Sequence, residues 1–258
     1  KIVLIAKDRF QVEIPLACFA QRVVEARVMP VVFFDNAARG GGFVGIKDGA
    51  PLSWLDELRG IVANAAKIHA VGSRHCFNGI ADSAELLALD RMPMPVEIDR
   101  PASTVTVNPG MRYYELLLAL EREGFALHNT ASLPHITVGG AVATATHGSG
   151  DRLQNLSGAV VAMEFVTSEG DVLRVARGDS DFAGMVVHVG ALGIVSEMTL
   201  DIQPSYRMRQ EVFLDLAWDM LYERFDEIMS CGDSVSLFTD YGDTVNELWV
   251  KTRVADDD

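Results

Sequence analysis

The sequence of 258 residues has few cysteines and no long hydrophobic run. Its three cysteines, Cys18, Cys76 and Cys231, are too scattered for a disulfide framework or a zinc site, which favours a reducing, cytoplasmic setting. Apolar runs such as 31–34 are far too short to span a bilayer, and no signal-peptide pattern is present. No pair of histidines or carboxylates has metal-ligand spacing, so no metal is expected.

Positive charge is also scarce. The 22 Lys and Arg residues are outnumbered by 36 Asp and Glu residues, which gives a formal net charge of −14. Phosphate-rich surfaces repel such a chain, so neither nucleic acid nor a membrane is expected as a partner. Hydrophobic residues make up 49% of the sequence, enough for the core of one large or two ordinary domains. These features leave the oligomeric state open.

Residues 1–50 are hard to assign. The stretch GGGFVG at 40–45 has the spacing G-x-G-x-x-G and follows a strand-like run at 31–35. A dinucleotide site would need a helix to begin within it, and the following KDGAP breaks any helix. We therefore favour a flexible glycine-rich loop over a Rossmann-type site.

From residue 51 onward helical and strand-like patterns alternate. Ser53 and Asp56 resemble a capping box, and Leu58 and Val62 fall on one helical face. The pattern predicts helices at 53–65, 114–124 and 213–231, a buried strand at 68–71, and further strands at 104–108, 159–166, 172–176, 193–200, 235–238 and 248–250. Residues 86–89 are a second short apolar run. Ser168 to Asp171 is a hairpin signal. The fold class is mixed α and β.

Two segments are suited to holding a ligand, 72–78 and 131–150. Gly72 and Ser73 directly follow a predicted strand, and such a loop exposes backbone N–H groups that suit a pyrophosphate. Arg74 either adds charge there or points to solvent. The second segment mixes glycines with threonines and serines, which let a backbone approach a ligand and bind its polar rim. Taken singly, each segment is more simply interpreted as a turn or a close strand contact.

Together these segments resemble the FAD-linked oxidases of the vanillyl-alcohol-oxidase type, and among them the alditol and xylitol oxidases, relatives of the aldonolactone oxidases. The motif G-S-x-H-S-F-N stands here as GSRHCFN at 72–78. The block A-S-L-P-H-I-[ST]-V-x-G-x-V-A-T-x-T-H-G-S-G stands at 131–150 almost unchanged. Residues 177–179, 190–195 and 235–240 also look like this branch, so the resemblance covers about residues 51–254.

The resemblance implies both a fold and a cofactor. The expected fold is α+β: an unassigned segment at 1–50, a PCMH-type FAD-binding domain of two α/β subdomains at 51–203, and at 204–258 the beginning of an α+β substrate domain. FAD would be linked through the ring of His75, and Ser132 would also contact substrate. The implied cofactor-binding residues are Gly72, Ser73, Arg74, His75, Cys76, Phe77, Asn78, Ser132, Thr137, Gly140, Thr144, Ala145, Thr146, His147, Ile194 and Val195.

The remaining histidines have simpler interpretations. His69 and His188 lie in a strand and an apolar stretch, so both are expected to be structural. His128 and His135 either line the flavin pocket or have structural, hydrogen-bonded roles.

The sequence departs from the family in three places. Cys76 replaces a serine after the linking histidine, and the later block has no cysteine near Ser132, so we expect a single flavin link. Residues 1–50 lack the usual tryptophan-containing opening segment; the first strand is either missing or supplied by 31–35. The glutamate, arginine and lysine that hold and deprotonate substrate in the family are expected beyond Asp258, so no catalytic residue is assigned.

The resemblance implies an FAD-dependent oxidase of polyols that passes hydride from a primary alcohol to flavin and uses O2 to form H2O2. Two alternatives stay open: an aldonolactone oxidase or dehydrogenase, and a flavin-binding fragment without turnover.

Overall fold

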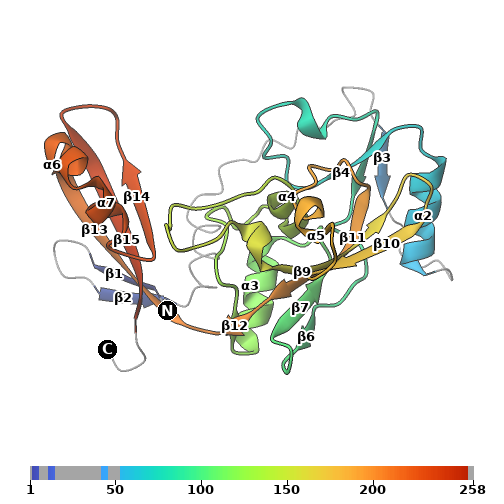
Figure 1. The fold of residues 1–258 in the computed structure, drawn as a ribbon, viewed down its shortest axis with the longest axis horizontal. Helices are drawn as coiled ribbons and strands as arrows, with labels where there is room; N and C mark the ends of the chain where they lie inside the picture. Colours follow the sequence, from blue (N-terminus) through green and yellow to red (C-terminus); the bar gives the residue numbers. More distant parts are fainter. Residues whose placement is uncertain (1, 6–10, 15–41, 46–52, 255–258) are drawn as a thin grey trace.

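The computed structural model describes residues 2–5, 11–14, 42–45 and 53–254. The strand expected at 31–35 and the first two glycines of the 40–45 stretch lie outside these residues. Helices and strands are both abundant, which confirms the mixed α and β class (Figure 1).

The 72–78 loop leaves the last residue of β4 (Ile68–Val71), an outer strand of a small parallel sheet. The order of this sheet is β3-β5-β4, with β3 (Gly42–Gly45) and β5 (Glu85–Ala88). Helix α2 (Trp54–Asn64) begins at Ser53, whose side chain accepts the Asp56 N–H at 3.2 Å, as the capping pattern predicts. Its buried Leu58 and Val62 pack with Leu87 of β5.

The largest core lies between an antiparallel sheet and two helices. The sheet order is β10-β9-β11-β7-β6, with β10 (Val172–Ala176), β9 (Val160–Val166), β11 (Ile194–Asp201), β7 (Thr104–Val107) and β6 (Glu97–Asp99). Helices α3 (Tyr113–Arg122) and α4 (Val138–Ala143) bury Leu116, Leu120 and Val142 in this core. Gly124, at φ +77°, ends α3 as predicted. The short strands β8 (Phe125–Ala126) and β12 (Gln203–Pro204) pair beside it, and α5 (Phe182–Met185) follows β10.

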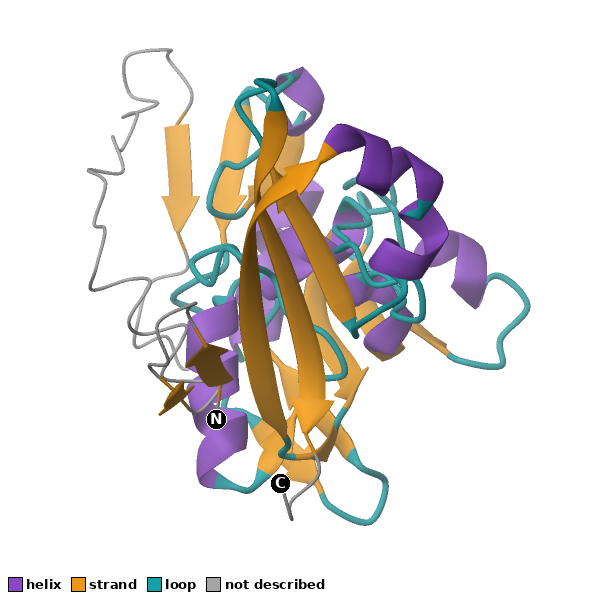
Figure 2. Ribbon diagram, turned by 90° about the vertical axis from the view of Figure 1, so that its left-hand side faces the viewer, coloured by secondary structure: helices purple, strands orange, loops and turns teal. Residues whose placement is uncertain are grey.

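A third sheet stands apart from this body (Figure 1). Its order is β14-β15-β13-β1-β2, with β14 (Ser234–Phe238), β15 (Thr244–Val254), β13 (Arg207–Ala217), β1 (Ile2–Ile5) and β2 (Gln11–Ile14). Figure 2 shows its long twisted strands, and the helices α6 (Trp218–Glu223) and α7 (Phe225–Met229) lie between β13 and β14 in the chain. Val235, Leu248 and Val250 form its small core.

Three sequence expectations were wrong in detail. Residues 213–217 are not helical but complete β13, because pairing with β15 along its length satisfies their backbone groups. Residues 42–45 are a strand rather than a loop, paired with β5. The strand at 68–71 is half-buried rather than buried.

Within the described residues, no helix has the length and apolarity needed to cross a membrane. Nor do those residues contain a group of three or more His, Cys, Asp or Glu placed to hold a metal ion. Cys76 and Cys231 are free thiols.

Candidate functional site

The 72–78 loop leaves β4 and is largely exposed. Arg74 has φ 59°, a left-handed conformation uncommon outside glycine, which turns the chain just before His75. Phe77 is fully exposed, and Asn78 ends the loop by accepting the Ile80 N–H at 3.1 Å. A fully exposed phenylalanine two residues after an exposed histidine is unusual for a loop without a ligand.

The 131–150 block is built around the start of α4. The Thr137 hydroxyl accepts the Gly140 N–H at 3.3 Å, and the Thr144 hydroxyl donates to the Gly140 carbonyl at 2.9 Å. After the helix, Ala145 has φ 52° and turns the chain into the exposed His147 and Gly148. The hydroxyls and exposed backbone of this block suit the polar rim of a ligand.

The loop and the block are in direct contact. A Cβ on Gly72 would lie only 2.2 Å from Thr137 Oγ1, so only glycine allows this approach. The Ser73 hydroxyl donates to the His135 carbonyl at 2.5 Å. The His75 and His135 rings lie 4.7 Å apart between centroids, with their Nε2 atoms 2.5 Å apart.

A third segment, 187–193, completes the arrangement. The Val189 N–H donates to the Ala143 carbonyl at 3.1 Å, which ties this segment to the end of α4. Gly190, at φ +81°, leaves room for the His69 ring, since a Cβ there would lie 2.1 Å from its Nε2. Val189 itself has φ 46°, which is costly for a β-branched residue.

The sequence reasoning missed this third segment. It assigned only Ile194 and Val195 from the 190–195 stretch, and the side chains of both are buried in β11. Their backbones pair with Val166 and Phe165 of β9. Val187, Val189 and Leu192 are the exposed hydrophobic residues here. The glycines at 190 and 193 were the signal that could have identified the segment.

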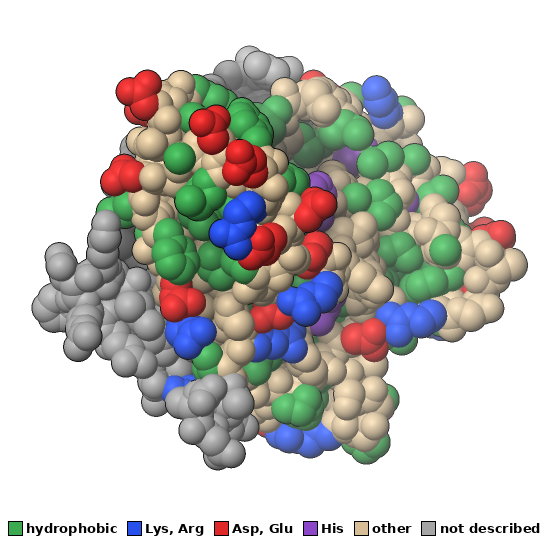
Figure 3. All heavy atoms as spheres, turned by 60° about the vertical axis from the view of Figure 1, so that its left-hand side comes forward, with side chains coloured by type: hydrophobic (Ala, Val, Ile, Leu, Met, Phe, Trp, Pro, Cys, Tyr) green, Lys and Arg blue, Asp and Glu red, His purple; other side chains and the backbone are tan. Residues whose placement is uncertain are grey.

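The residues present fit an FAD molecule. The 72–78 loop meets the 131–150 block through a glycine approach that a Cβ would fill, and the Val189 N–H joins segment 187–193 to the end of α4. These segments and the residues next to them carry both exposed hydrophobic side chains and polar hydroxyls, the mixture that an aromatic ring system joined to a pyrophosphate needs. Those hydrophobic side chains are Phe77, Ile80, Leu133, Val187, Val189 and Leu192. Figure 3 shows histidine side chains in a hollow of the surface, with hydrophobic side chains on either side.

Burial affects two of the histidines around this site. The pKa of His135 is lowered by burial, and then by His75 and Arg112 nearby, so the neutral ring is favoured. Burial lowers the pKa of His188 to about 4, and its Nδ1 accepts the Gly190 N–H at 3.0 Å. His188 also packs edge-on against Phe165, consistent with the structural role expected for it.

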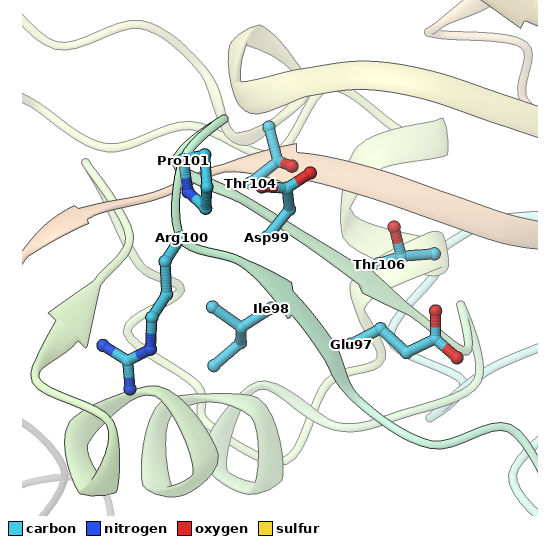
Figure 4. A pocket seen from close by; sticks show the side chains of 7 residues that line it. All are labelled: Glu97, Ile98, Asp99, Arg100, Pro101, Thr104 and Thr106. Atoms are coloured by element: carbon cyan, nitrogen blue, oxygen red, sulfur yellow. The ribbon is translucent and has the colours of Figure 1, made fainter.

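A separate hollow lies at the edge of the large sheet. It is lined by residues of β6 and β7 and of the turn between them: Glu97, Ile98, Asp99, Arg100, Pro101, Thr104 and Thr106 (Figure 4). Arg100 points away from the threonines and pairs with Glu123 at 2.5 Å. None of the predicted flavin contacts lines this hollow.

Comparison with known proteins agrees with the geometry. Residues 55–176 match the FAD binding domain family, and this range includes the 72–78 loop and the 131–150 block. The chain belongs to the vanillyl-alcohol-oxidase (PCMH-type) flavoproteins. It is 41% identical to an alditol oxidase of Streptomyces sp. over 203 residues, which cover 77% of this chain and 48% of that protein.

A second relative and a solved structure are also similar to this chain. The chain is 35% identical to an L-gulono-1,4-lactone dehydrogenase of Mycobacterium tuberculosis, over 70% of this chain and 43% of that protein. It therefore spans about half the length of the curated relatives it matches. A cholesterol oxidase from B. sterolicum superposes with a TM-score of 0.65 at 17% identity, covering 78% of this chain and 42% of that one, which shows a shared fold.

Proposed function

We propose that this chain is the flavin-binding part of an FAD-dependent oxidase of polyols, with FAD attached through His75. The observation that carries the proposal is the meeting of the 72–78 loop with the 131–150 block at Gly72 and Thr137. The identity of 41% to an alditol oxidase supports the polyol as substrate class.

The chain's own residues would bind and orient the cofactor. The backbone N–H groups after Gly72 would hold the pyrophosphate, and the Thr144 and Thr146 hydroxyls would line the flavin. Ser132 is exposed on the same block and would also contact the substrate. When bound, FAD supplies the acceptor for a hydride from an alcohol carbon. Reoxidation of the reduced flavin by dioxygen gives hydrogen peroxide. Protein groups supply orientation and electrostatics.

The covalent link has a direct test. The purified protein is denatured in acid and run on a denaturing gel, and the flavin fluorescence of the polypeptide band is recorded. We expect fluorescence in the wild type and none in His75→Ala. His128→Gln is the matched control, because the groups acting on His128 are Asn155, Asp201 and Arg253 rather than the flavin segments. A wild-type band without fluorescence would contradict the link.

A lactone substrate is the second candidate. The identity of 35% to an L-gulono-1,4-lactone dehydrogenase favours it. A panel of polyols and aldonolactones, assayed in parallel for peroxide formation and for dye reduction, separates the two. Peroxide from a polyol supports the first proposal, and dye reduction by a lactone alone supports the second. A yellow protein that no substrate bleaches without oxygen supports flavin binding without turnover.

The remaining proposals concern the domain boundary and the cellular compartment. We propose that the FAD-binding domain spans 51–203 and that a substrate domain begins at 204. The separate sheet of β13, β14 and β15 supports this boundary. We also propose a cytoplasmic setting, supported by the scarcity of cysteine.

A further inference from the structure

The third sheet turns one of its two faces toward the FAD-binding body. Side chains alternate between the faces along a strand, and directly opposed residues of neighbouring strands share a face. One face is the small core around Val235 and Leu248, packed against Ile228 of α7. On the other face, which we call the inner face, the Ser234 hydroxyl lies 3.0 Å from the Ser149 hydroxyl of the 131–150 block. Figure 1 shows β14 as the strand of this sheet on the side of the body.

Further contacts hold the inner face at a fixed distance from the body. Arg253 of β15 shares this face by alternation and donates to the His128 carbonyl and to Gln203 Oε1, both at 3.1 Å. A Cβ on Gly150 would lie 2.3 Å from the carbonyl oxygen of Asp233, so only glycine lets the block lie this close to the start of β14. The inner face is therefore a fixed surface beside the block.

Beyond Ser234 the inner face carries a group of side chains that suits a carbon chain bearing hydroxyl groups. Ser236 lies opposite Trp249, and Phe238 lies opposite Glu247, in the pairing of β14 with β15. The rings of Phe238 and Trp249 are 4.9 Å apart between centroids, and the Trp249 Nε1–H donates to the Glu247 carboxylate at 2.6 Å. We call Ser236, Phe238, Glu247 and Trp249 the inner wall.

We propose that the inner wall binds the part of a polyol substrate that extends beyond the reacting carbon, and so sets the preference for chain length. This inference rests on the polyol function proposed above. The ring of Phe238 would pack against the C–H groups of the polyol, and the Ser236 hydroxyl would bind its hydroxyl groups. The Trp249 N–H occupies only one of the several acceptor sites of the Glu247 carboxylate, so this group also accepts from substrate hydroxyls.

The dimensions and charge of the wall favour a long, neutral substrate. Phe238 is 47% exposed although it lies on the face turned to the body. From Ser234 to Phe238 the strand extends about 13 Å, at about 3.3 Å per residue. A polyol held at the flavin segments therefore needs several carbons to reach the outer end of the wall, and glycerol is too short. The carboxylate of Glu247 repels a sugar acid, which leaves an uncharged polyol as the preferred occupant.

The experiment measures binding without turnover. The purified protein is treated with dithionite under anaerobic conditions, so that any bound flavin is reduced and accepts no hydride, and is dialysed to equilibrium with radiolabelled sorbitol or glycerol. We expect Phe238→Ala and Glu247→Gln to raise the Kd for sorbitol about tenfold, equivalent to about 1.4 kcal/mol. Binding of glycerol should not change. Glu247→Gln keeps the shape of the side chain and an oxygen for the Trp249 N–H, which guards against loss of binding through misfolding.

Phe213→Ala is the matched control. Phe213 belongs to the same sheet and is 51% exposed, but it lies opposite Leu248 and therefore on the other face. This variant should bind sorbitol as the wild type does.

Four results would overturn the inference: an unchanged sorbitol Kd in both wall variants, an equal loss of sorbitol and glycerol binding, the same loss in Phe213→Ala, or a wild type that binds no sorbitol. The proposed function fails on a different observation, a wild type that binds sorbitol but whose oxidised flavin sorbitol does not bleach in the absence of oxygen.

Discussion

The approach of Gly72 to Thr137 joins the 72–78 loop to the 131–150 block, and replacing this glycine with alanine tests it. The new Cβ would lie 2.2 Å from Thr137 Oγ1 and 3.3 Å from Thr137 Cβ, so the segments must move apart. Overpacking of this kind costs about 1–3 kcal/mol. Gly72 does not have a positive φ, so alanine is not strained there. By restricting the unfolded chain, alanine also raises the free energy of unfolding by about 0.4–1 kcal/mol. We therefore expect Gly72→Ala to lower the free energy of unfolding by about 1–2 kcal/mol.

Thr137→Ala provides the second arm of a double-mutant cycle. It removes the Oγ1 atom that obstructs the new Cβ and also the cap on the Gly140 N–H, which costs about 1 kcal/mol by itself. In that background Gly72→Ala should be neutral or stabilising. Urea unfolding of the wild type, both single variants and the double variant gives the coupling.

Gly60→Ala is the control for the substitution of glycine by alanine. Gly60 lies exposed within α2, and a Cβ added there would have no other atom within 4 Å, so Gly60→Ala should stabilise the protein by about 0.5–1 kcal/mol. If Gly72→Ala costs the same with and without the Thr137 side chain, the close approach is not the reason for glycine at this position.

Two further predictions concern stability. The Glu164 carboxylate is buried and is bound by Arg174 at 2.6 Å and by the Ser196 hydroxyl at 2.8 Å. Arg174→Ala should therefore lower the free energy of unfolding, measured in urea, by about 1–3 kcal/mol. This loss should be larger than that of Ser196→Ala. An equal or smaller cost for the arginine would contradict this. Burial lowers the pKa of His188 to about 4 in the folded protein, so on acidification His188 is protonated in the unfolded chain before it is protonated in the folded one. The free energy of unfolding should therefore fall as the pH drops from about 6.5 to about 4. His188→Asn should flatten this part of the pH–stability curve, and an unchanged slope would rule His188 out as its source.

Local sequence patterns predicted α2, α3, β4, β7, β9, β10 and β11, but not α4, β6 or the first half of β13. The Ser53 cap, the four-residue spacing of Leu58 and Val62, and the hairpin around Gly170 depend on interactions between near neighbours, which the sequence displays directly. Residues 213–217 show the limit of such patterns. Their apolar residues fit a helix locally, but the pairing with β15, some thirty residues later, decides their conformation.

The sequence by itself determined the family and singled out the two segments proposed to hold the flavin, because the 72–78 and 131–150 motifs are specific as ordered strings of residues. Only the tertiary structure decided how these segments meet. Two contacts join positions about sixty residues apart. His75 contacts His135, and Gly72 packs closely against Thr137. The hydrogen bond from Val189 to Ala143 likewise adds a third segment. Such contacts depend on how strands and helices pack in three dimensions, which no local pattern records.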